Sequence, residues 1–547
     1  MSAYAVTDRD IEPLSRFRYL LASAVLVTIA QPPFPTGWLA YIALVPFLIG
    51  IEGLRGRRAF GYGLSWGILV NALGLYWLAA NHVGSFLGAL VYLGVVDGLF
   101  TWLLCRIRQE RRAWFFPFVW TGFLYLKSLG EMGCPWLSLS LTQTYTPAAI
   151  QLAAISGAWG LDLWVAAINS LVYSGLRRLS KDKVEIKPFS IAKVFGPAAG
   201  LALIVLLYGR IVLIAGGADE SERFTRLGGE LTVAEIPPWI EEGGRPLRVA
   251  AIQGSVRPDV KLAPQMLQYN FYLYGRLTRA AIAETGGNID LIVWPETAVV
   301  QYLNRSWRSR QSVQDLQKEI RVPIMTGAFA AIHKDGRFKH YNAAFMVSNR
   351  YLSSGSEIYA KRLLVPFGER VPYQKVLGFM AGWSMGWSDF SMGEGAPLLG
   401  GTPRTPDVPP IGLLICYESV FSRLVRPEVV DGARVLAVIT NDAWFGRTTG
   451  PYQHTKAATL RAVEFRRPVI RVANSGVTAL IDRWGRIHMA TPLYTKCAVA
   501  GRVWPESGMT FFARTGDWLP VITLLVAVVG LFLFMEPKKG RAVLKTE

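Results

Sequence analysis

Apolar residues dominate the first 216 positions of the chain and return once near its C-terminus. Residues 19–216 form nearly continuous apolar stretches, which short basic loops interrupt, whereas 217–510 mixes apolar and polar residues as a globular domain does. A bilayer core needs about 20 apolar residues per helix. The pattern therefore predicts eight membrane spans, near 16–34, 37–54, 60–80, 86–105, 113–130, 153–175, 195–216 and 516–535.

These spans divide the chain into three expected parts. They are a bundle of about seven transmembrane helices over 1–216, an outer globular domain over 217–515, and a C-terminal helix with its tail over 516–547. The first two spans are separated by Pro32-Pro33-Phe34-Pro35, which marks either a turn or a break within one hydrophobic hairpin.

The distribution of Lys and Arg predicts how the bundle is oriented. With a cytoplasmic N-terminus, the inside segments 1–18, 55–58, 106–112, 177–193 and 536–547 hold 3, 3, 4, 6 and 4 Lys or Arg residues. The short loops on the opposite side hold essentially none, with Lys127 at the end of the fifth span as the only candidate. Because positive loops stay inside, both termini are expected in the cytoplasm and the domain 217–515 outside.

The composition agrees with a membrane protein and limits its partners. With 51% hydrophobic residues and a mean hydropathy of +0.28, the chain is too apolar for an ordinary soluble enzyme. The net charge of +19 partly reflects inside loops that face anionic lipid. No basic stripe interleaved with aromatic residues stands out, so we expect no nucleic-acid partner. Residues 1–15 are polar and mixed in charge, which favours an uncleaved first span over a signal peptide.

The outer domain alternates strand-like and helix-like segments, as an α/β domain does. Helices are expected at 264–285, 309–319, 420–430 and 453–465. Strands are expected at Leu247–Gln253, Ile289–Val293, Val322–Phe329, Ala343–Val347, Glu357–Tyr359, Ile411–Ile415, Ala433–Thr440, 468–473 and 477–482.

Three short stretches of this domain carry groups that suit acyl transfer. Glu296 and Cys416 directly follow strand-like segments, and Lys361 precedes the apolar segment Leu363–Phe367. A thiol must lose its proton before it attacks a carbonyl, and a carboxylate can accept that proton. A lysine can stabilise the oxyanion that forms. No histidine falls in these stretches, so Glu296 is the expected base.

Each of these residues also has a structural interpretation. Cys416 could be a small core hydrophobe, Glu296 could cap a helix, and Lys361 could pair with Glu357. Glu369 and Glu418 could fix Lys361 and keep it protonated, or be solvated. A structural role is the expectation for Asn441, Trp444, Gln453, His454, Arg461 and Arg471. The other cysteines, Cys105, Cys134 and Cys497, indicate no disulfide framework, which favours a shielded site for Cys416.

Four motifs in order resemble the apolipoprotein N-acyltransferase family of the nitrilase (carbon–nitrogen hydrolase) superfamily. They are WPET at 294–297, KRLLVPFGERVP at 361–372, CYE at 416–418 and TNDAWFG at 440–446. The resemblance covers nearly the whole chain and implies a two-sheet αββα sandwich. It also implies roles in activity for Glu369, Tyr417 and Glu418, with the Tyr417 N–H joining Lys361 in the oxyanion site.

The resemblance further implies the reaction. Cys416 would take the sn-1 acyl chain of a phospholipid, with phosphatidylethanolamine as the usual donor, and pass it from a thioester to the α-amino group of a diacylglyceryl cysteine on an apolipoprotein. A monomer in the bacterial inner membrane, with a periplasmic catalytic domain and no cofactor, is expected. The family commonly has a Lys-Trp pair where this chain reads Lys261-Leu262, which puts lipid preference in doubt.

Two other functions stay open at this point. One is a membrane-anchored amidase that uses water as acceptor, although seven spans before the domain exceed what an anchor needs. The other is a transporter or receptor with a non-catalytic outer domain. It predicts paired charges or broken-helix repeats in the spans, and these are sparse.

Overall fold

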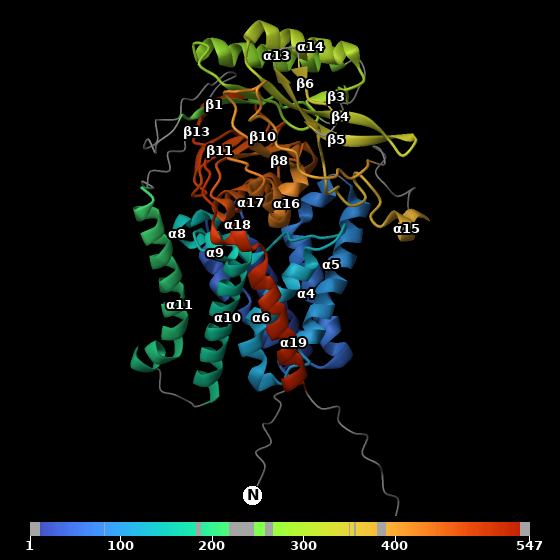
Figure 1. Cartoon of the computed structure of the whole chain (residues 1–547). Helices are drawn as coiled ribbons and strands as arrows, with labels where there is room; N and C mark the ends of the chain where they lie inside the picture. The colour runs from blue at the N-terminus through green and yellow to red at the C-terminus, as the bar shows by residue number, and fades with distance from the viewer. Residues whose placement is uncertain are drawn as a thin grey trace, which may run out of the picture.

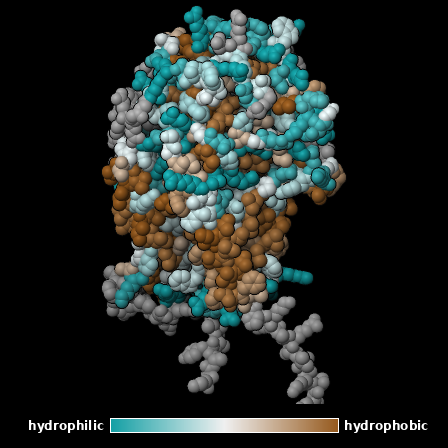
Figure 2. Space-filling view, viewed as in Figure 1, coloured by the Kyte–Doolittle hydropathy of each residue, from teal (hydrophilic) through white to brown (hydrophobic). Residues whose placement is uncertain are grey.

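A bundle of helices lies beneath an α/β sandwich in the computed structural model of the chain (Figure 1). The structure describes residues 11–80, 82–181, 188–217, 245–257, 266–348, 351–354, 357–379 and 390–535. Figure 2 shows hydrophobic residues gathered on the lower half of the molecule, over the bundle, and hydrophilic residues on the sandwich above it. This division follows the change in sequence character near residue 216.

The main helices of the bundle lie close to the expected spans. They are α1 (Pro13–Ala30), α4 (Gly56–Gly74), α5 (Val83–Leu104), α6 (Gln109–Lys127), α10 (Ala158–Lys181), α11 (Pro188–Ala215) and α19 (Trp518–Phe534). Three described helices are long and apolar enough to cross a membrane, namely α1, α5 and α11 over Ile191–Ala215. The count rises to four if a bent pair ending in α10 forms one span. The expected eight spans are therefore not confirmed.

The second expected span, 37–54, is wrong as a continuous helix. It forms a 3-10 turn η1 (Gly37–Leu39) and two short helices, α2 (Ala40–Ala43) and α3 (Val45–Gly50). Pro46 lies in the first turn of α3, where its missing N–H is tolerated. Asn169 of α10 satisfies the break, since its side chain accepts from the Leu44 N–H at 2.8 Å and donates to the Ala40 carbonyl at 2.8 Å.

A second break lies before α10. The short helices α8 (Pro147–Ile150) and α9 (Ala153–Ser156) meet α10 at an angle of 118°. Gly157 forms the corner at φ +66°, a conformation that a glycine adopts without a steric penalty. Hydropathy averaged along the chain cannot detect this corner, because the residues on both sides of it are apolar.

Two sheets form the centre of the sandwich. The first has the order β13-β1-β2-β4-β5-β6, with β3 beside β4 and β7 beside β5, and the second has the order β12-β11-β10-β9-β8. The first sheet comprises β1 (Leu247–Gln253), β2 (Leu291–Val293), β3 (Val299–Tyr302), β4 (Ile324–Lys334), β5 (Arg337–Ser348), β6 (Tyr351–Leu352), β7 (Tyr359–Ala360) and β13 (Cys497–Val503). The second comprises β8 (Ile411–Ile415), β9 (Val435–Thr440), β10 (Val469–Ala473), β11 (Ala479–Ile481) and β12 (Ile487–Ala490).

Helices cover both outer faces of the sheets, which gives the αββα layers (Figure 1). The helices α13 (Leu267–Glu284) and α14 (Trp307–Ile320) cover the first sheet on the side away from the bundle. The helices α16 (Ser422–Val430) and α17 (Gly450–Phe465) lie between the second sheet and the bundle. The fold therefore has the layer order that the resemblance predicted.

Alternating side chains of β8 connect two hydrophobic cores. Leu413 and Ile415 pack between the two sheets, whereas Leu414 points to the other face. The core that contains Leu414 continues through α16 and α17 into the bundle, where it includes Trp164 and Phe116. The sandwich and the bundle thus share the core that contains Leu414, which is continuous between them.

Candidate active site

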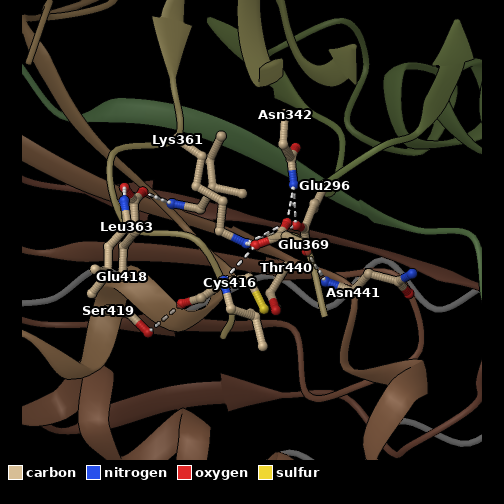
Figure 3. A network of polar contacts seen from close by, with 12 residues as sticks. Glu296, Asn342, Lys361, Leu363, Glu369, Cys416, Glu418, Ser419, Thr440 and Asn441 are labelled. Atoms are coloured by element: carbon tan, nitrogen blue, oxygen red, sulfur yellow. Dashed lines mark hydrogen bonds and ion pairs between the residues drawn. The ribbon is translucent and has the colours of Figure 1, made fainter. Parts of the chain in front are cut away.

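Glu296, Lys361 and Cys416 come together between the two sheets, although they lie far apart in the sequence (Figure 3). Glu296 follows β2, Lys361 directly follows β7, and Cys416 directly follows β8. All three are buried, with exposed fractions of 6%, 1% and 8%. The structure therefore brings the three predicted groups into one water-poor site.

Strand ends explain this convergence. β8 and β9 are adjacent and parallel, so Cys416 and Asn441, the residues that follow them, lie at the same edge of the second sheet. Gly327 of β4 lets the segment after β2 approach the first sheet closely. A Cβ atom at this position would lie 2.7 Å from the Glu296 Cα atom.

Hydrogen bonds from three directions hold the Glu296 carboxylate. Its Oε1 atom accepts from Asn342 Nδ2 at 2.7 Å and from Lys361 Nζ at 3.4 Å. Its Oε2 atom accepts from the Asn441 N–H at 2.8 Å. These donors fix the orientation of the carboxylate that the sequence predicts to be the base.

Lys361 lies between two carboxylates. Its Nζ atom is 2.9 Å from a carboxylate oxygen of Glu369 and 3.4 Å from Glu296. Burial lowers the pKa of Lys361, but the charges of Glu369 and Glu296 outweigh it and hold the pKa above its usual value. The lysine is therefore an ammonium, as oxyanion stabilisation requires.

Glu369 also belongs to this charge network. Its carboxylate accepts from Asn342 Nδ2 at 2.9 Å and from the Val365 N–H at 2.9 Å. Asn342 thus donates to both carboxylates. The structure places Glu369 where the sequence interpretation expected a carboxylate that fixes the lysine.

Cys416 adopts an unusual backbone conformation. Its φ of +54° is in the left-handed region, which side chains other than glycine rarely adopt and which often occurs at functional sites. Burial, and then the charge of Glu296, raise the pKa of its thiol, and Lys361 only partly opposes them. The resting side chain is therefore a neutral thiol, which needs a base before it can attack.

Glu418 has a different role from Glu369. Its Oε2 atom accepts from the Ile415 N–H at 2.7 Å and from the Tyr359 hydroxyl at 2.8 Å. Its Oε1 atom accepts from the N–H groups of Arg362 at 2.6 Å and Leu363 at 3.2 Å. Burial raises the pKa of Glu418, although Arg362 opposes the shift. Glu418 therefore joins the Cys416 turn to the segment after Lys361 through backbone contacts.

Tyr417 connects the site to the bundle. Its hydroxyl donates to the Gly133 carbonyl at 2.6 Å, and its ring stacks on Trp136 with centroids 6.2 Å apart. Trp136 and Trp77 both donate to Gln453 Oε1 of α17, at 2.8 Å and 3.2 Å. The structure therefore buries Trp136 at the junction of bundle and sandwich.

Asn342 is the site residue that sequence reasoning missed, and Asn441 was assigned only a structural role. Asn342 lies in β5 just before the apolar run Ala343–Val347, where a buried amide is an exception to the pattern. That exception is the only sequence signal for it. Leu262 lies outside the described residues.

Models of two protein families match the chain. The apolipoprotein N-acyltransferase N-terminal domain matches residues 23–171, and the carbon–nitrogen hydrolase domain matches residues 248–500. Together they cover the bundle helices α4, α5 and α6 and nearly all of the sandwich. The carbon–nitrogen hydrolase match agrees with the two sheets and their covering helices.

Whole proteins are also similar to this chain. A protein of Geobacter metallireducens named apolipoprotein N-acyltransferase is 35% identical over 528 residues, which cover 93% of both chains. One of the same name from Azotobacter vinelandii is 30% identical over 535 residues, again with 93% of both chains covered. The solved structure of Saccharomyces cerevisiae Nit3, of the nitrilase superfamily, has a TM-score of 0.36 and 17% identity over 47% of this chain and 89% of its own.

Proposed function

Because the chain belongs to the apolipoprotein N-acyltransferase family, we propose that its N-acylation of lipoproteins proceeds through a thioester on Cys416. Membership makes the protein a membrane acyltransferase of the carbon–nitrogen hydrolase superfamily, with a lipid donor and a lipoprotein acceptor. The observation that carries the proposal is the burial of Cys416 beside Glu296 and Lys361.

In the first half-reaction, Glu296 removes the Cys416 proton and the thiolate attacks the sn-1 ester carbonyl of a phospholipid. Lys361 and the Tyr417 N–H stabilise the oxyanion. The tetrahedral intermediate then collapses, the C–O bond to the glycerol breaks, and Glu296 returns its proton to the leaving lysophospholipid oxygen. The acyl chain remains on sulfur as a thioester.

In the second half-reaction, the α-amino group of the diacylglyceryl cysteine attacks the thioester. Glu296 accepts a proton from the amine, the C–S bond breaks, and the sulfur leaves as a thiolate that recovers a proton from Glu296. The products are the amide and free Cys416, as in other two-step covalent reactions. Burial of the site supports this order, because water would otherwise hydrolyse the thioester.

The surroundings of the site support lipid substrates. Tyr417 contacts Gly133 of the bundle, and the hydrophobic surface lies directly beneath the sandwich (Figure 2). We infer that the protein is a monomer in the bacterial inner membrane, with both termini in the cytoplasm and the sandwich in the periplasm. Its three parts are then the N-terminal bundle at 1–216, the catalytic domain at 217–515 and the C-terminal helix with its tail at 516–547. Phosphatidylethanolamine is the inferred donor. The basic inside loops support this orientation.

Acyl-chain trapping tests the proposal. The purified protein is incubated in detergent with phosphatidylethanolamine labelled in its sn-1 chain, and its peptides are analysed by mass spectrometry. One acyl group is expected on the peptide that contains Cys416, and it should move to a diacylated lipopeptide added later. Cys416→Ala should abolish both signals. Cys497→Ala, which removes a buried thiol from β13, should retain them.

Two outcomes would contradict the proposal. Acyl transfer by the Cys416→Ala variant would exclude Cys416 as the nucleophile. Loss of the acyl group to water at the same rate with and without lipopeptide, together with cleavage of simple amides, would favour the amidase function.

A further inference from the structure

A buried chain of polar side chains contacts the Cys416 turn, and it includes neither Glu296 nor Lys361. Arg471 donates to Asp442 Oδ2 at 2.6 Å, and Asp442 Oδ1 lies 2.9 Å from His454 Nδ1. The His454 Nε2 atom lies 3.0 Å from the Cys416 carbonyl oxygen and 2.9 Å from Ser419 Oγ. The His454, Asp442 and Arg471 side chains are fully buried.

The partners of His454 indicate which of its ring nitrogens donates to the Cys416 carbonyl. A backbone carbonyl oxygen and an ionised carboxylate only accept hydrogen bonds. Burial raises the pKa of Asp442, but Arg471 and His454 outweigh it and lower the pKa to about 2, so Asp442 is ionised. The Nε2 atom therefore faces an acceptor and must carry an N–H, whereas Nδ1 lies 2.9 Å from Asp442 Oδ1 and 3.3 Å from Arg471 Nη2, which is a donor.

A ring without a proton on Nε2 satisfies this arrangement poorly. With a proton on Nδ1 alone, Nε2 could accept from the Ser419 hydroxyl, but its lone pair would face the Cys416 carbonyl oxygen at 3.0 Å. The Ser419 hydroxyl is also within 2.9 Å of that same oxygen, to which it donates. A proton on Nε2 meets these contacts, since Nε2–H then points to the Cys416 carbonyl oxygen and to Ser419 Oγ.

The Cys416 carbonyl belongs to the same planar peptide group as the Tyr417 N–H, so the two bonds point in opposite directions. Whatever holds the carbonyl therefore aims the N–H. His454 lies on the carbonyl side of this peptide, and the N–H points away from it. A hydrogen-bond donor on the oxygen side also polarises the peptide and strengthens its N–H as a donor.

We propose that His454 is a positioning residue which, held by Asp442 and Arg471, donates from Nε2 to the Cys416 carbonyl and so aims the Tyr417 N–H at the oxyanion. The inference rests on the proposed function, in which that N–H stabilises the tetrahedral intermediate. It gives His454 a part in the chemistry although the ring does not touch substrate. The same contact also holds Cys416 in its left-handed backbone conformation.

Rates of Cys416 acylation test the positioning role. The purified protein in detergent micelles is mixed with labelled phosphatidylethanolamine at a series of mole fractions, and single-turnover acylation is followed. His454→Phe keeps a ring without donors, and His454→Gln supplies a neutral donor. We expect a rate loss of about 100-fold for Phe and about 10-fold for Gln, because misdirected oxyanion donors cost that order. The mole fraction for half-maximal rate should not change.

A second histidine provides a matched control. His488 on β12 pairs with Asp482 at 3.0 Å but lies in a strand at the far edge of the second sheet from β8. His488→Gln removes a similar pair and should leave the acylation rate unchanged. If the His454→Phe variant acylated Cys416 as fast as the unmodified protein, the positioning role would be overturned. The proposed Cys416 mechanism would still stand, because acylation of the unmodified protein tests it separately.

The protonation state is testable without any variant of His454. Solid-state 15N NMR of histidine-labelled protein in bilayers distinguishes protonated from bare ring nitrogens. The chain has five histidines. Replacing each of the other four by Gln in turn identifies its signal, and the signal that is left belongs to His454. A protonated Nε2 is expected at pH 7.5. A bare Nε2 would overturn the proposal even if the His454 variants failed to fold.

Discussion

Replacing Asn342 by Asp would put a third negative charge between Glu296 and Glu369. The Asn342 Nδ2 atom lies 2.7 Å from one carboxylate oxygen and 2.9 Å from the other. An oxygen of Asp at that position would repel each by about 6 kcal/mol at an effective dielectric constant of about 20. Lys361 and local relaxation offset part of this, and we expect a net cost of about 4 kcal/mol, equivalent to about three pKa units.

The site can relieve this cost by binding a proton, which the three carboxyl groups would share. A proton on Glu296 removes the base, so single-turnover acylation of Cys416 by labelled phospholipid should fall about threefold at pH 7 and about 100-fold near pH 5, and recover as the pH rises above 7. Stability has the opposite pH dependence. A carboxyl with a raised folded pKa destabilises the fold as the pH rises from about 4 through that pKa, so the melting temperature should drop more at pH 8 than at pH 5.

Asn304→Asp is the matched control, because Asn304 donates to the Ala331 carbonyl at 2.9 Å on the first sheet and contacts none of the three site residues in any described hydrogen bond. It should keep the parental acylation rate and pH profile. Parental acylation by the Asn342→Asp variant at pH 7 would refute the electrostatic reasoning.

Three further changes test other contacts. Glu418→Gln would turn an amide N–H toward backbone donors, so we expect the free energy of unfolding to fall by about 3 kcal/mol in denaturant titrations. Glu357→Gln, at a half-exposed side chain, should change it little. Asp442 has a folded pKa of about 2 against 3.8 normally, so it contributes stability above about pH 4 that is lost toward pH 2. Asp442→Asn should remove about 2 kcal/mol of that acid dependence, and an unchanged acid-unfolding curve would contradict this. Asn169→Leu would leave the Leu44 N–H and the Ala40 carbonyl without partners, and a loss of about 2–4 kcal/mol should appear in thermal unfolding.

Local patterns predicted the strands that position the site. The apolar run Ile411–Ile415 forms β8 as expected, with Cys416 directly after it. The strand before Glu296 is shorter than expected, since β2 covers only Leu291–Val293. The strand expected at Glu357–Tyr359 shifts to Tyr359–Ala360, because pairing with β5 fixes its register. Apolar runs identify strands, but their ends depend on the partner strand.

Contacts between distant segments could not be predicted in this way. Asn342 binds Glu296 and Glu369 only because β5 lies beside both segments, and one sequence carries no record of that pairing. The break at Leu44 depends on Asn169, which is 125 residues further along the chain. Glu418 was expected near the lysine side chain, and the sequence could not reveal that four donors around it belong mostly to the backbone.

The hydrophobic core that runs without interruption from Leu414 through α17 to Phe116 makes the enzyme and its anchor a single folding unit. A sandwich expressed without the bundle would expose to water the apolar surface of α16 and α17 that packs on the bundle, and it should aggregate. A soluble version for screening or crystallography would therefore need polar replacements on that surface. Detergents that insert between the sandwich and the bundle should abolish activity before they unfold the bundle.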